Sequence, residues 1–256
     1  PVLFDYNQCM EIAIGKLGNV LPEFAEADTY PTRVRLPDEP LMLAHRIMSI
    51  EGEAKSMTSG RVITEHDIKE DAWYLDGGVI PTWIAVEAGQ ADLFLSGYLG
   101  IDFITKGQAT YRLLDAEVTF HRSLPGPGEY IRYDIQVLEF FKQGDTYLFR
   151  FQFEATVNGE LLLTMRKGIA GFFTQEELDA GKGVVLTRMD KAEEKGKAPA
   201  DWSHPVSMQE ESYSEQQLQA LRHGDLVSCF GPQFSQLNLQ KAATIPDGKM
   251  RLVHRI

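Results

Sequence analysis

Hydrophobic and polar residues alternate along two runs in the middle of the chain. In residues 131–137 and again in 147–157, every second position is apolar or aromatic, and most positions between them are polar. Alternation at period two is typical of β-strands with one buried face. Asn158 and Gly159 follow the second run, and both residue types accept the positive φ that a type I′ turn requires. The pattern therefore predicts a hairpin whose returning strand covers residues 161–173.

An apolar segment of a different kind lies earlier in the chain. Residues 81–99 are apolar on nearly every face of a helix, with Glu87 and Asp92 as their only charges, and such a helix has to be surrounded by other structure. Further strand-like runs cover residues 41–50, 61–68 and 108–122. The order of two strands, a buried helix and four antiparallel strands predicts an α+β fold in which one curved sheet wraps around a long central helix.

The pattern along the chain divides it into four segments. Residues 1–30 are expected to form a helical lead-in, because their apolar positions are spaced as on a helix. Residues 31–175 hold the sheet and its helix. Residues 176–235 are charged and contain proline and glycine, which is typical of a linker, and a helix is expected near residues 214–223. Residues 236–256 are interpreted as the opening strand of a second unit.

A short internal repeat supports the last of these assignments. Residues 36–47 read LPDEPLMLAHRI and residues 245–256 read IPDGKMRLVHRI, with six of twelve positions identical and no gap. Because the first copy lies just ahead of a predicted strand, we expect a second copy of the unit to begin near residue 236. The chain also starts without a methionine and stops in an apolar run, so we interpret it as a piece of a longer protein.

The composition argues against several classes of protein. With 43% hydrophobic and 24% charged residues, the chain resembles a folded domain rather than a disordered segment. Its net charge of −12 argues against nucleic acid as a partner, since binding phosphates requires clustered lysine and arginine. Cys9 and Cys229 are far apart and suggest neither a disulfide framework nor a metal site. No signal peptide or long apolar run is present, so we expect a cytoplasmic protein without a membrane partner.

One segment resembles a known active site. In residues 73–90, WYLDGGVIPTWIAVEAGQ, a loop with two glycines and a proline leads directly into the buried helix. The segment resembles the active-site stretch of the hotdog-fold β-hydroxyacyl thioester dehydratases of fatty-acid synthesis, in which an aromatic-rich loop, a V-x-P step and a helix with one acidic residue follow in that order. The residues that carry the match are Tyr74, Val79, Pro81 and Glu87. The resemblance covers about residues 31–175, and the run GQADLFLSGYLGIDF narrows it to the tandem dehydratase region of bacterial polyunsaturated fatty acid synthases.

The resemblance implies a mechanism with two catalytic side chains and no cofactor or metal. A histidine takes the α-proton of the substrate, and a helix acid, here Glu87, protonates or holds the departing β-hydroxyl. The family's histidine falls fourteen residues before the acid, on Trp73, whose indole cannot accept a proton. Thr82 stands at a glycine position and Ala91 at a glutamine position, with Gln90 one residue early. The implied substrate-binding residues are Trp73, Val79, Pro81, Thr82, Trp83 and Gln90.

The missing histidine leads to a composite-site hypothesis, because active sites of the resembled family combine groups from two hotdogs. We expect Glu87 to serve a histidine of an adjacent second hotdog, so that the parent protein removes water from a 3-hydroxyacyl thioester carried by an acyl carrier protein. On this hypothesis the chain by itself is inactive. A homodimer is another arrangement open to it. Two alternatives remain: a non-catalytic pseudo-hotdog that stabilises its neighbour, and a hotdog acyl thioesterase that uses the carboxylate alone.

Physical chemistry singles out Glu87 independently of the resemblance. An ionised carboxylate in so apolar a helix costs several kcal/mol unless it is paired, so its pKa should be perturbed or an arginine of a strand should pair with it. Asp92, about 140° further round a continuous helix, is expected to be structural. His66 and His121 remain candidates for the base, whereas His45 is expected to be structural. Candidates for a local basic surface facing an acidic carrier are Arg46, Arg122, Arg166 and Lys167.

Overall fold

The computed structural model describes residues 1–181, 183, 186–188, 191–192, 196, 200–201, 212–237, 239 and 242–256. Much of the predicted linker, including residues 202–211, lies outside the described residues. The chain forms two compact units, Pro1–Gly181 and Lys182–Ile256. None of the helices in the described part is long and apolar enough to cross a membrane.

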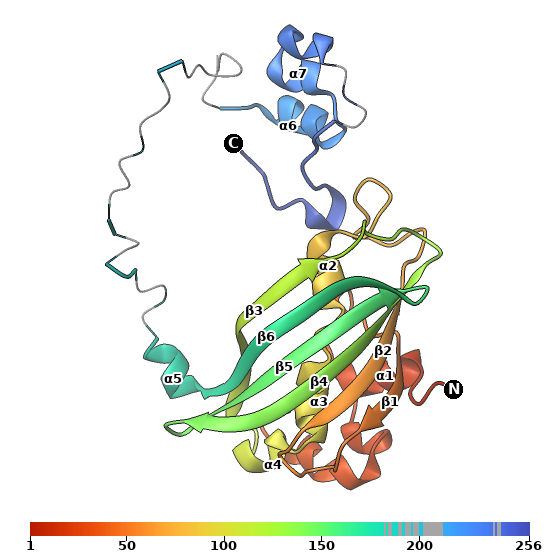
Figure 1. The fold of residues 1–256 in the computed structure, drawn as a ribbon, viewed down its shortest axis with the longest axis vertical. Coiled ribbons are helices and arrows are strands. Elements are labelled where there is room, and N and C mark those ends of the chain that lie inside the picture. Colours follow the sequence, from red (N-terminus) through yellow and green to blue (C-terminus); the bar gives the residue numbers. More distant parts are fainter. Residues whose placement is uncertain are drawn as a thin grey trace. The chain divides into compact units, whose positions relative to one another are not determined.

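The first unit is built on one six-stranded antiparallel sheet with the strand order β1-β2-β4-β5-β6-β3. The sheet curves around helices α2 and α3, which lie behind it in Figure 1. The strands are β1 Arg46–Glu51, β2 Gly60–Asp67, β3 Ala109–Phe120, β4 Tyr130–Gln143, β5 Thr146–Val157 and β6 Glu160–Thr174. This is the α+β hotdog fold that the sequence pattern and the resemblance predicted.

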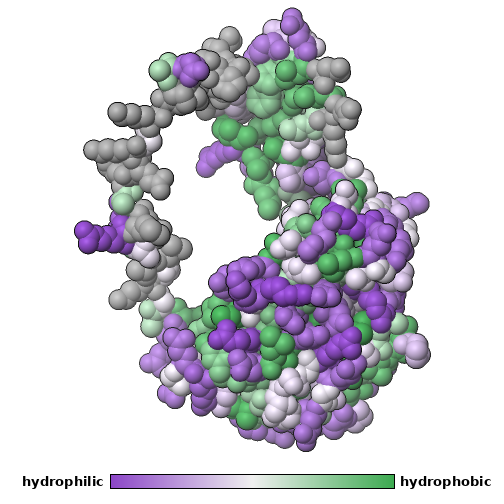
Figure 2. Space-filling model, in the orientation of Figure 1, coloured by the Kyte–Doolittle hydropathy of each residue, from purple (hydrophilic) through white to green (hydrophobic). Residues whose placement is uncertain are grey.

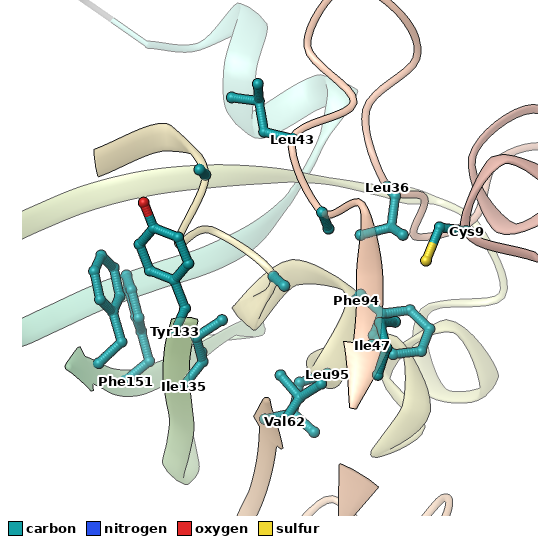
Figure 3. Packing of buried hydrophobic residues seen from close by; sticks show 14 of the residues in the cluster. Cys9, Leu36, Leu43, Ile47, Val62, Phe94, Leu95, Tyr133, Ile135 and Phe151 are labelled. Carbon is teal, nitrogen blue, oxygen red and sulfur yellow. The ribbon is translucent and has the colours of Figure 1, made fainter. Parts of the chain in front are cut away.

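The alternating runs form the inner face of the sheet, as expected. On β4, Tyr133 and Ile135 are fully buried, and on β5 Phe151 is buried in the same layer. Figure 3 shows Leu95 of the central helical segment and Val62 of β2 in the same cluster. The predicted hairpin turn is confirmed, because both of its residues have positive φ, 53° at Asn158 and 82° at Gly159. Burial of aromatic and branched side chains on one face thus fixes the register of the sheet.

The central helix is not continuous, which corrects the prediction of one helix over residues 81–99. It consists of α2 Thr82–Glu87 and α3 Asp92–Tyr98, followed by α4 Ile101–Thr105. The last turn of α2 tightens, because the amides of Gly89 and Gln90 bond to carbonyls three residues back. The break lies against the sheet: a Cβ on Gly89 would stand only 2.6 Å from a ring carbon of Phe153. The close approach of backbone and sheet therefore requires glycine at this position.

A substitution at this break tests the packing. We expect Gly89→Ala to destabilise the fold by about 1–3 kcal/mol, because the added methyl overlaps the rings of Phe153 and Tyr133. Gly196→Ala is the control, since open space surrounds that glycine. Urea unfolding of both variants measures the difference. Equal stability of the two variants would show that the break can move away from the sheet at no cost.

The N-terminal segment packs beside β1. It contains α1 Tyr6–Ile14, η1 Leu17–Asn19 and η2 Pro22–Thr29. Asp5 caps α1 in a capping box with Gln8, and Phe4 forms a bridge to Ile47 of β1. The buried Arg33 guanidinium pairs with Asp28 at 2.8 Å and donates to carbonyls of the lead-in. The Phe4 bridge joins the helical lead-in to the sheet, and the Arg33 bonds hold parts of the lead-in together.

The two edges of the sheet differ. The edge at β1 is partly covered by the bridge from Phe4, whereas β3 pairs only with β6 among the residues that the structure describes. Strand β3 also exposes apolar side chains, among them Leu114, Val118 and Phe120. The surface of the unit visible in Figure 2 is a mixture of hydrophilic and hydrophobic residues. An open strand edge with exposed apolar side chains is suited to pairing with another strand.

The second unit is helical in its described part. The helix expected near residues 214–223 is confirmed as α6, whose N-terminus is capped by Ser214. The elements after the sheet are α5 Gln175–Asp179 of the first unit and α6 Glu215–Arg222, α7 Leu226–Phe230, η3 Pro232–Gln236 and η4 Gly248–Met250 of the second. No strand occurs among the described residues of 236–256. A second hotdog beginning there stays a prediction.

Candidate active site

The loop before α2 is held by backbone bonds at its end. Asp76 and Val79 form a bridge across a turn in which Gly77 and Gly78 have positive φ. The amide of Ile80 then donates to the Pro125 carbonyl at 3.0 Å. Of the predicted substrate-binding residues in this stretch, Val79 is half-buried, Pro81 is the N-cap residue of α2 and Thr82 is exposed. The loop therefore fixes where α2 begins, and with it the position of the helix acid.

Glu87 is the last residue of α2 and is half-buried. Its Oε2 accepts a hydrogen bond from Gln90 Nε2 at 2.9 Å, so two of the predicted site residues are in contact. No ion pair to Glu87 occurs among the described residues, which removes the pairing with a strand arginine considered from the sequence. Burial raises the pKa of Glu87 above its ordinary value. A carboxyl group in this state is suited to holding a proton.

Trp73 cannot replace the missing histidine. Its indole Nε1 donates to the Pro40 carbonyl at 3.1 Å, and its ring centroid lies 6.0 Å from that of Trp83. Trp83 is the exposed member of this aromatic pair. The two rings form an apolar surface on the loop and the first turn of α2, which is suited to contacting an apolar chain and offers no group that accepts a proton.

His66 is buried and both of its ring nitrogens are hydrogen-bonded, so it is not free to act as a base. Its Nδ1 lies 2.8 Å from the carbonyl of Leu43, and its Nε2 lies 2.7 Å from the hydroxyl of Tyr74. Because a carbonyl only accepts, Nδ1 carries the proton and Nε2 accepts from the tyrosine. The ring stacks on His45 with centroids 4.7 Å apart, and Nδ1 of His45 accepts from the Asp67 amide. Tyr74 thus anchors the loop to β2 through His66.

The contribution of this histidine pair to stability is expected to fall in acid. Burial lowers the pKa of His66 to about 4 from its ordinary 6.5 and also lowers the pKa of His45. The unfolded chain then binds more protons between pH 6.5 and 4, so stability is fully present above pH 6.5 and is lost as the pH falls towards 4. The loss expected from His66 is on the order of 3 kcal/mol.

Urea unfolding of the wild type and of His66→Gln at pH 7 and at pH 4.5 measures this loss. The difference between the two proteins removes the opposite contribution of the buried acids Asp92 and Asp102, whose pKa values burial raises. His121→Gln is the control, since this exposed histidine bonds only to Thr164 Oγ1 on the neighbouring strand, and the variant should keep the full pH dependence. If wild type and His66→Gln differ in free energy of unfolding by the same amount at both pH values, the neutral state of the pair is contradicted.

None of the remaining described histidines contacts Glu87. His121, His223 and His254 are exposed, and no described histidine forms a hydrogen bond or ion pair with Glu87. His204 lies outside the described residues. Of the two candidates from the sequence, His66 therefore uses both ring nitrogens elsewhere, and His121 bonds to β6.

Asp92 is the site residue whose surroundings the sequence did not predict. Its side chain is fully buried, Oδ2 accepts from the Tyr111 hydroxyl at 3.1 Å, and Oδ1 has no hydrogen-bond partner among the described residues. Burial raises the pKa of Asp92 to about 7, and the charge of Glu87 adds to the rise. The partner comes from β3, so only the sheet topology brings it to the helix. The two acids of the central helix are thus electrostatically coupled.

The predicted basic residues all form ion pairs. Arg46 binds Glu65 and Asp67, and the three others each bind one acid. Those pairs are Arg122 with Glu160, Arg166 with Glu154 and Lys167 with Glu117. Because each positive charge has a nearby carboxylate, these residues make a mixed surface rather than a basic patch.

Comparison with known proteins gives one family and one long relative. Residues 36–166 match the FabA-like domain family. The chain is 39% identical, over 99% of its length, to a polyunsaturated fatty acid synthase subunit of Thraustochytrium sp., and it spans 17% of the length of that protein. A solved structure, the dehydratase heterocomplex ApeI:P from Xenorhabdus doucetiae, is 21% identical with a TM-score of 0.44, covering 58% of this chain and 93% of that one. A second solved structure, zebra fish thioesterase superfamily member 2, is 19% identical with a TM-score of 0.35. The match covers 62% of this chain and 97% of that one.

Proposed function

The chain belongs to the FabA-like domain family, and on this premise we propose that it forms part of a 3-hydroxyacyl thioester dehydratase. In the proposed reaction a base removes the α-proton, the β-hydroxyl leaves as water after receiving a proton, and a carbon–carbon double bond forms. Glu87 supplies the proton or holds the leaving hydroxyl. The relative named as part of a polyunsaturated fatty acid synthase supports polyunsaturated fatty acid synthesis as the setting and a carrier-bound acyl thioester as the substrate.

The observation that carries the proposal is the state of Glu87. The carboxyl group is half-buried at the end of α2, contacts the amide of Gln90 and has a raised pKa without an opposing cation. A helix acid that served only structure would be expected to pair with an arginine of the sheet. An acid that must exchange a proton with a hydroxyl near neutral pH benefits from a raised pKa instead.

The second part of the proposal concerns the base. Trp73 stands at the family's histidine position and its N–H is bonded to Pro40, while the ring nitrogens of His66 are engaged with Leu43 and Tyr74. We therefore place the base on an adjacent hotdog unit. The unpaired edge of β3, with Val118 and Phe120 exposed, is the surface on which that unit would dock.

A product assay tests the proposed reaction. The protein that contains this chain with its neighbouring hotdog is incubated with a 3-hydroxyacyl thioester on acyl carrier protein, and the products are separated by mass spectrometry. We expect an enoyl thioester, about 18 Da lighter than the substrate because one water is lost. Release of the free thiol and a carboxylic acid would instead show that the protein is a thioesterase. An unchanged substrate would indicate that the unit has only a structural role.

A further inference from the structure

Residues 213–256 repeat residues 4–47. A shift of 209 positions aligns Phe4 with Tyr213 and Ile47 with Ile256 without a gap, and nine of the 44 aligned residues are identical. Six of the nine lie in the twelve-residue repeat at the ends of the two segments. The other three lie in the helical parts and are Gln8 with Gln217, Gly15 with Gly224 and Leu17 with Leu226. The repeat therefore includes the helical lead-in as well as the strand-like end.

The helices of the two segments start at the same shift. Helix α6 begins 209 residues after α1, and α7 begins 209 residues after η1. Both α1 and α6 open with a capping box, formed by Asp5 with Gln8 in the first segment and by Ser214 with Gln217 in the second. Two helix starts and one cap therefore agree with the alignment of the sequences.

A backbone hydrogen bond that joins the two ends of each segment is also repeated. The amide of Phe4 donates to the Ile47 carbonyl at 3.0 Å, and the amide of Tyr213 donates to the Ile256 carbonyl at 2.9 Å. Each donor is the residue just before the N-cap of the first helix. The strand-like end of the second segment thus returns to the start of its helix in the same way as that of the first.

A contact near the end of the first helix is repeated as well. In the first segment, Arg33 Nη2 donates to the Gly15 carbonyl at 2.9 Å. In the second segment, a Cβ on Gly224 would stand 3.3 Å from the Cβ of Ala242, and Ala242 is the residue aligned with Arg33. The two segments therefore have related tertiary structures as well as related sequences.

The two segments differ in the burial of their strand-like ends. In the first, Leu43 is 4% exposed and Ile47 is fully buried, and Figure 3 shows Ile47 with Phe94 of α3 in the core cluster. The aligned residues Leu252 and Ile256 are 74% and 51% exposed. The second segment therefore presents to solvent the apolar side chains that the sheet and the central helix cover in the first unit.

We propose that residues 213–256 are the lead-in and the opening strand of a second hotdog, and that the apolar surface of Leu252 and Ile256 binds the sheet and the central helix of that hotdog. This sheet and this helix belong to the segment of the protein that follows Ile256. The second hotdog then starts at residue 213 rather than near residue 236. The connection between the two hotdogs is reduced to about residues 182–212, since the first unit ends at Gly181.

The proposal also extends the proposed function, because it says where the neighbouring hotdog comes from. The unit that supplies the base is then the continuation of the same polypeptide and not a second copy of the chain. This consequence rests on the proposed function, whereas the docking itself rests only on the repeat. The first unit and a second copy of the chain are the other occupants of the apolar surface that an experiment has to separate.

Amide hydrogen exchange tests the docking without any substrate. The 256-residue chain is compared with the longer protein that continues through the neighbouring hotdog. We expect the amides of residues 251–256 to exchange at least about 100-fold more slowly in the longer protein. The first copy is the internal reference, since the His45 amide donates to the Glu65 carbonyl of β2 at 3.0 Å and should be protected in both proteins. The aligned His254 amide should be protected only in the longer one.

Leu252→Lys in the longer protein tests the surface itself. A lysine buried without a partner charge is costly, so residues 251–256 should exchange as fast as in the 256-residue chain, while residues 43–47 stay protected. Thr244→Lys is the matched control, because Thr244 and its aligned residue Arg35 are both exposed, and it should leave the protection unchanged. A second hotdog that fails to fold in the Leu252 variant gives the same loss, confined to residues after 212, and supports the proposal equally.

Three results would overturn the proposal. The first is fast exchange of residues 251–256 in the longer protein, and the second is protection that Leu252→Lys leaves in place. The third is slow exchange of these residues in the 256-residue chain: at every concentration it would show that the first unit covers them, and only at high concentration that a second copy does. The rate of the Glu87→Gln variant tests the proposed function separately, so the two failures give different results.

Discussion

Replacing Glu87 by Gln is expected to lower the rate of water elimination by about 10²–10⁴-fold, the usual contribution of a general acid. The substitution keeps the size and the hydrogen-bonding shape of the side chain, and Gln90 can still contact the new amide. What is lost is the proton that the leaving hydroxyl requires. The measurement is the formation of enoyl thioester by the assembled protein, with the unfolding transition recorded in parallel.

Glu70→Gln is the matched control for this experiment. Glu70 is exposed on the same loop that leads into α2, so the variant makes the same chemical change and alters the net charge equally. It should retain the wild-type rate. If Glu87→Gln also eliminates water at the wild-type rate, Glu87 is not the acid, and the unit is a scaffold for its neighbour.

Placing two charges on the open sheet edge should separate the unit from its neighbour. Val118 and Phe120 are both exposed on β3, and an unpaired lysine buried in an interface costs several kcal/mol. We expect the double variant Val118→Lys/Phe120→Lys to reduce dehydration by about 100-fold or more, because the acid and the base are no longer brought together. Amide hydrogen exchange of residues 109–120 should rise at the same time, since the strand edge loses its cover.

Leu138→Lys controls for the added charge. Leu138 is 44% exposed on β4, away from the β3 edge, and the variant should keep both the rate and the exchange pattern. A double variant of β3 that dehydrates as fast as the Leu138 variant would show that the neighbour docks elsewhere.

The sequence predicted those parts of the fold that depend on patterns of neighbouring residues. The alternation along residues 131–137 and 147–157 fixes which face of β4 and β5 is buried, because successive side chains of a strand point to opposite faces. The turn at Asn158 and Gly159 needs two residues that accept positive φ, and both are adjacent in the sequence. The alternation at period two and the two-residue turn are both defined by neighbouring residues, so their prediction does not depend on the rest of the chain.

The break in the central helix could not be read from the same pattern. Residues 81–99 contain no proline after the first residue, and their apolar character suits a continuous helix equally well. Gly89 is required because Phe153 and Tyr133, more than forty residues later, lie where its Cβ would be. Asp92 therefore begins α3, although the apolar pattern alone placed it inside one continuous helix.

Two further features depend on contacts between distant residues. Tyr74 was singled out for its place in the family motif, yet its hydroxyl bonds to His66, which no motif includes. The strand expected within residues 236–256 is not seen among the residues that the structure describes, and it stays a prediction. The segment boundaries and a bacterial source stay predictions.

The central claim is that this chain supplies the acid of a site whose base lies on another hotdog. The most direct measurement compares the rate of water elimination from a 3-hydroxyacyl thioester by the 256-residue chain alone and by the same chain joined to its neighbouring hotdog. We expect no enoyl product above background from the chain alone, whether monomeric or self-paired, and a rate that depends on Glu87 from the joined protein. Full activity of the chain alone would contradict it.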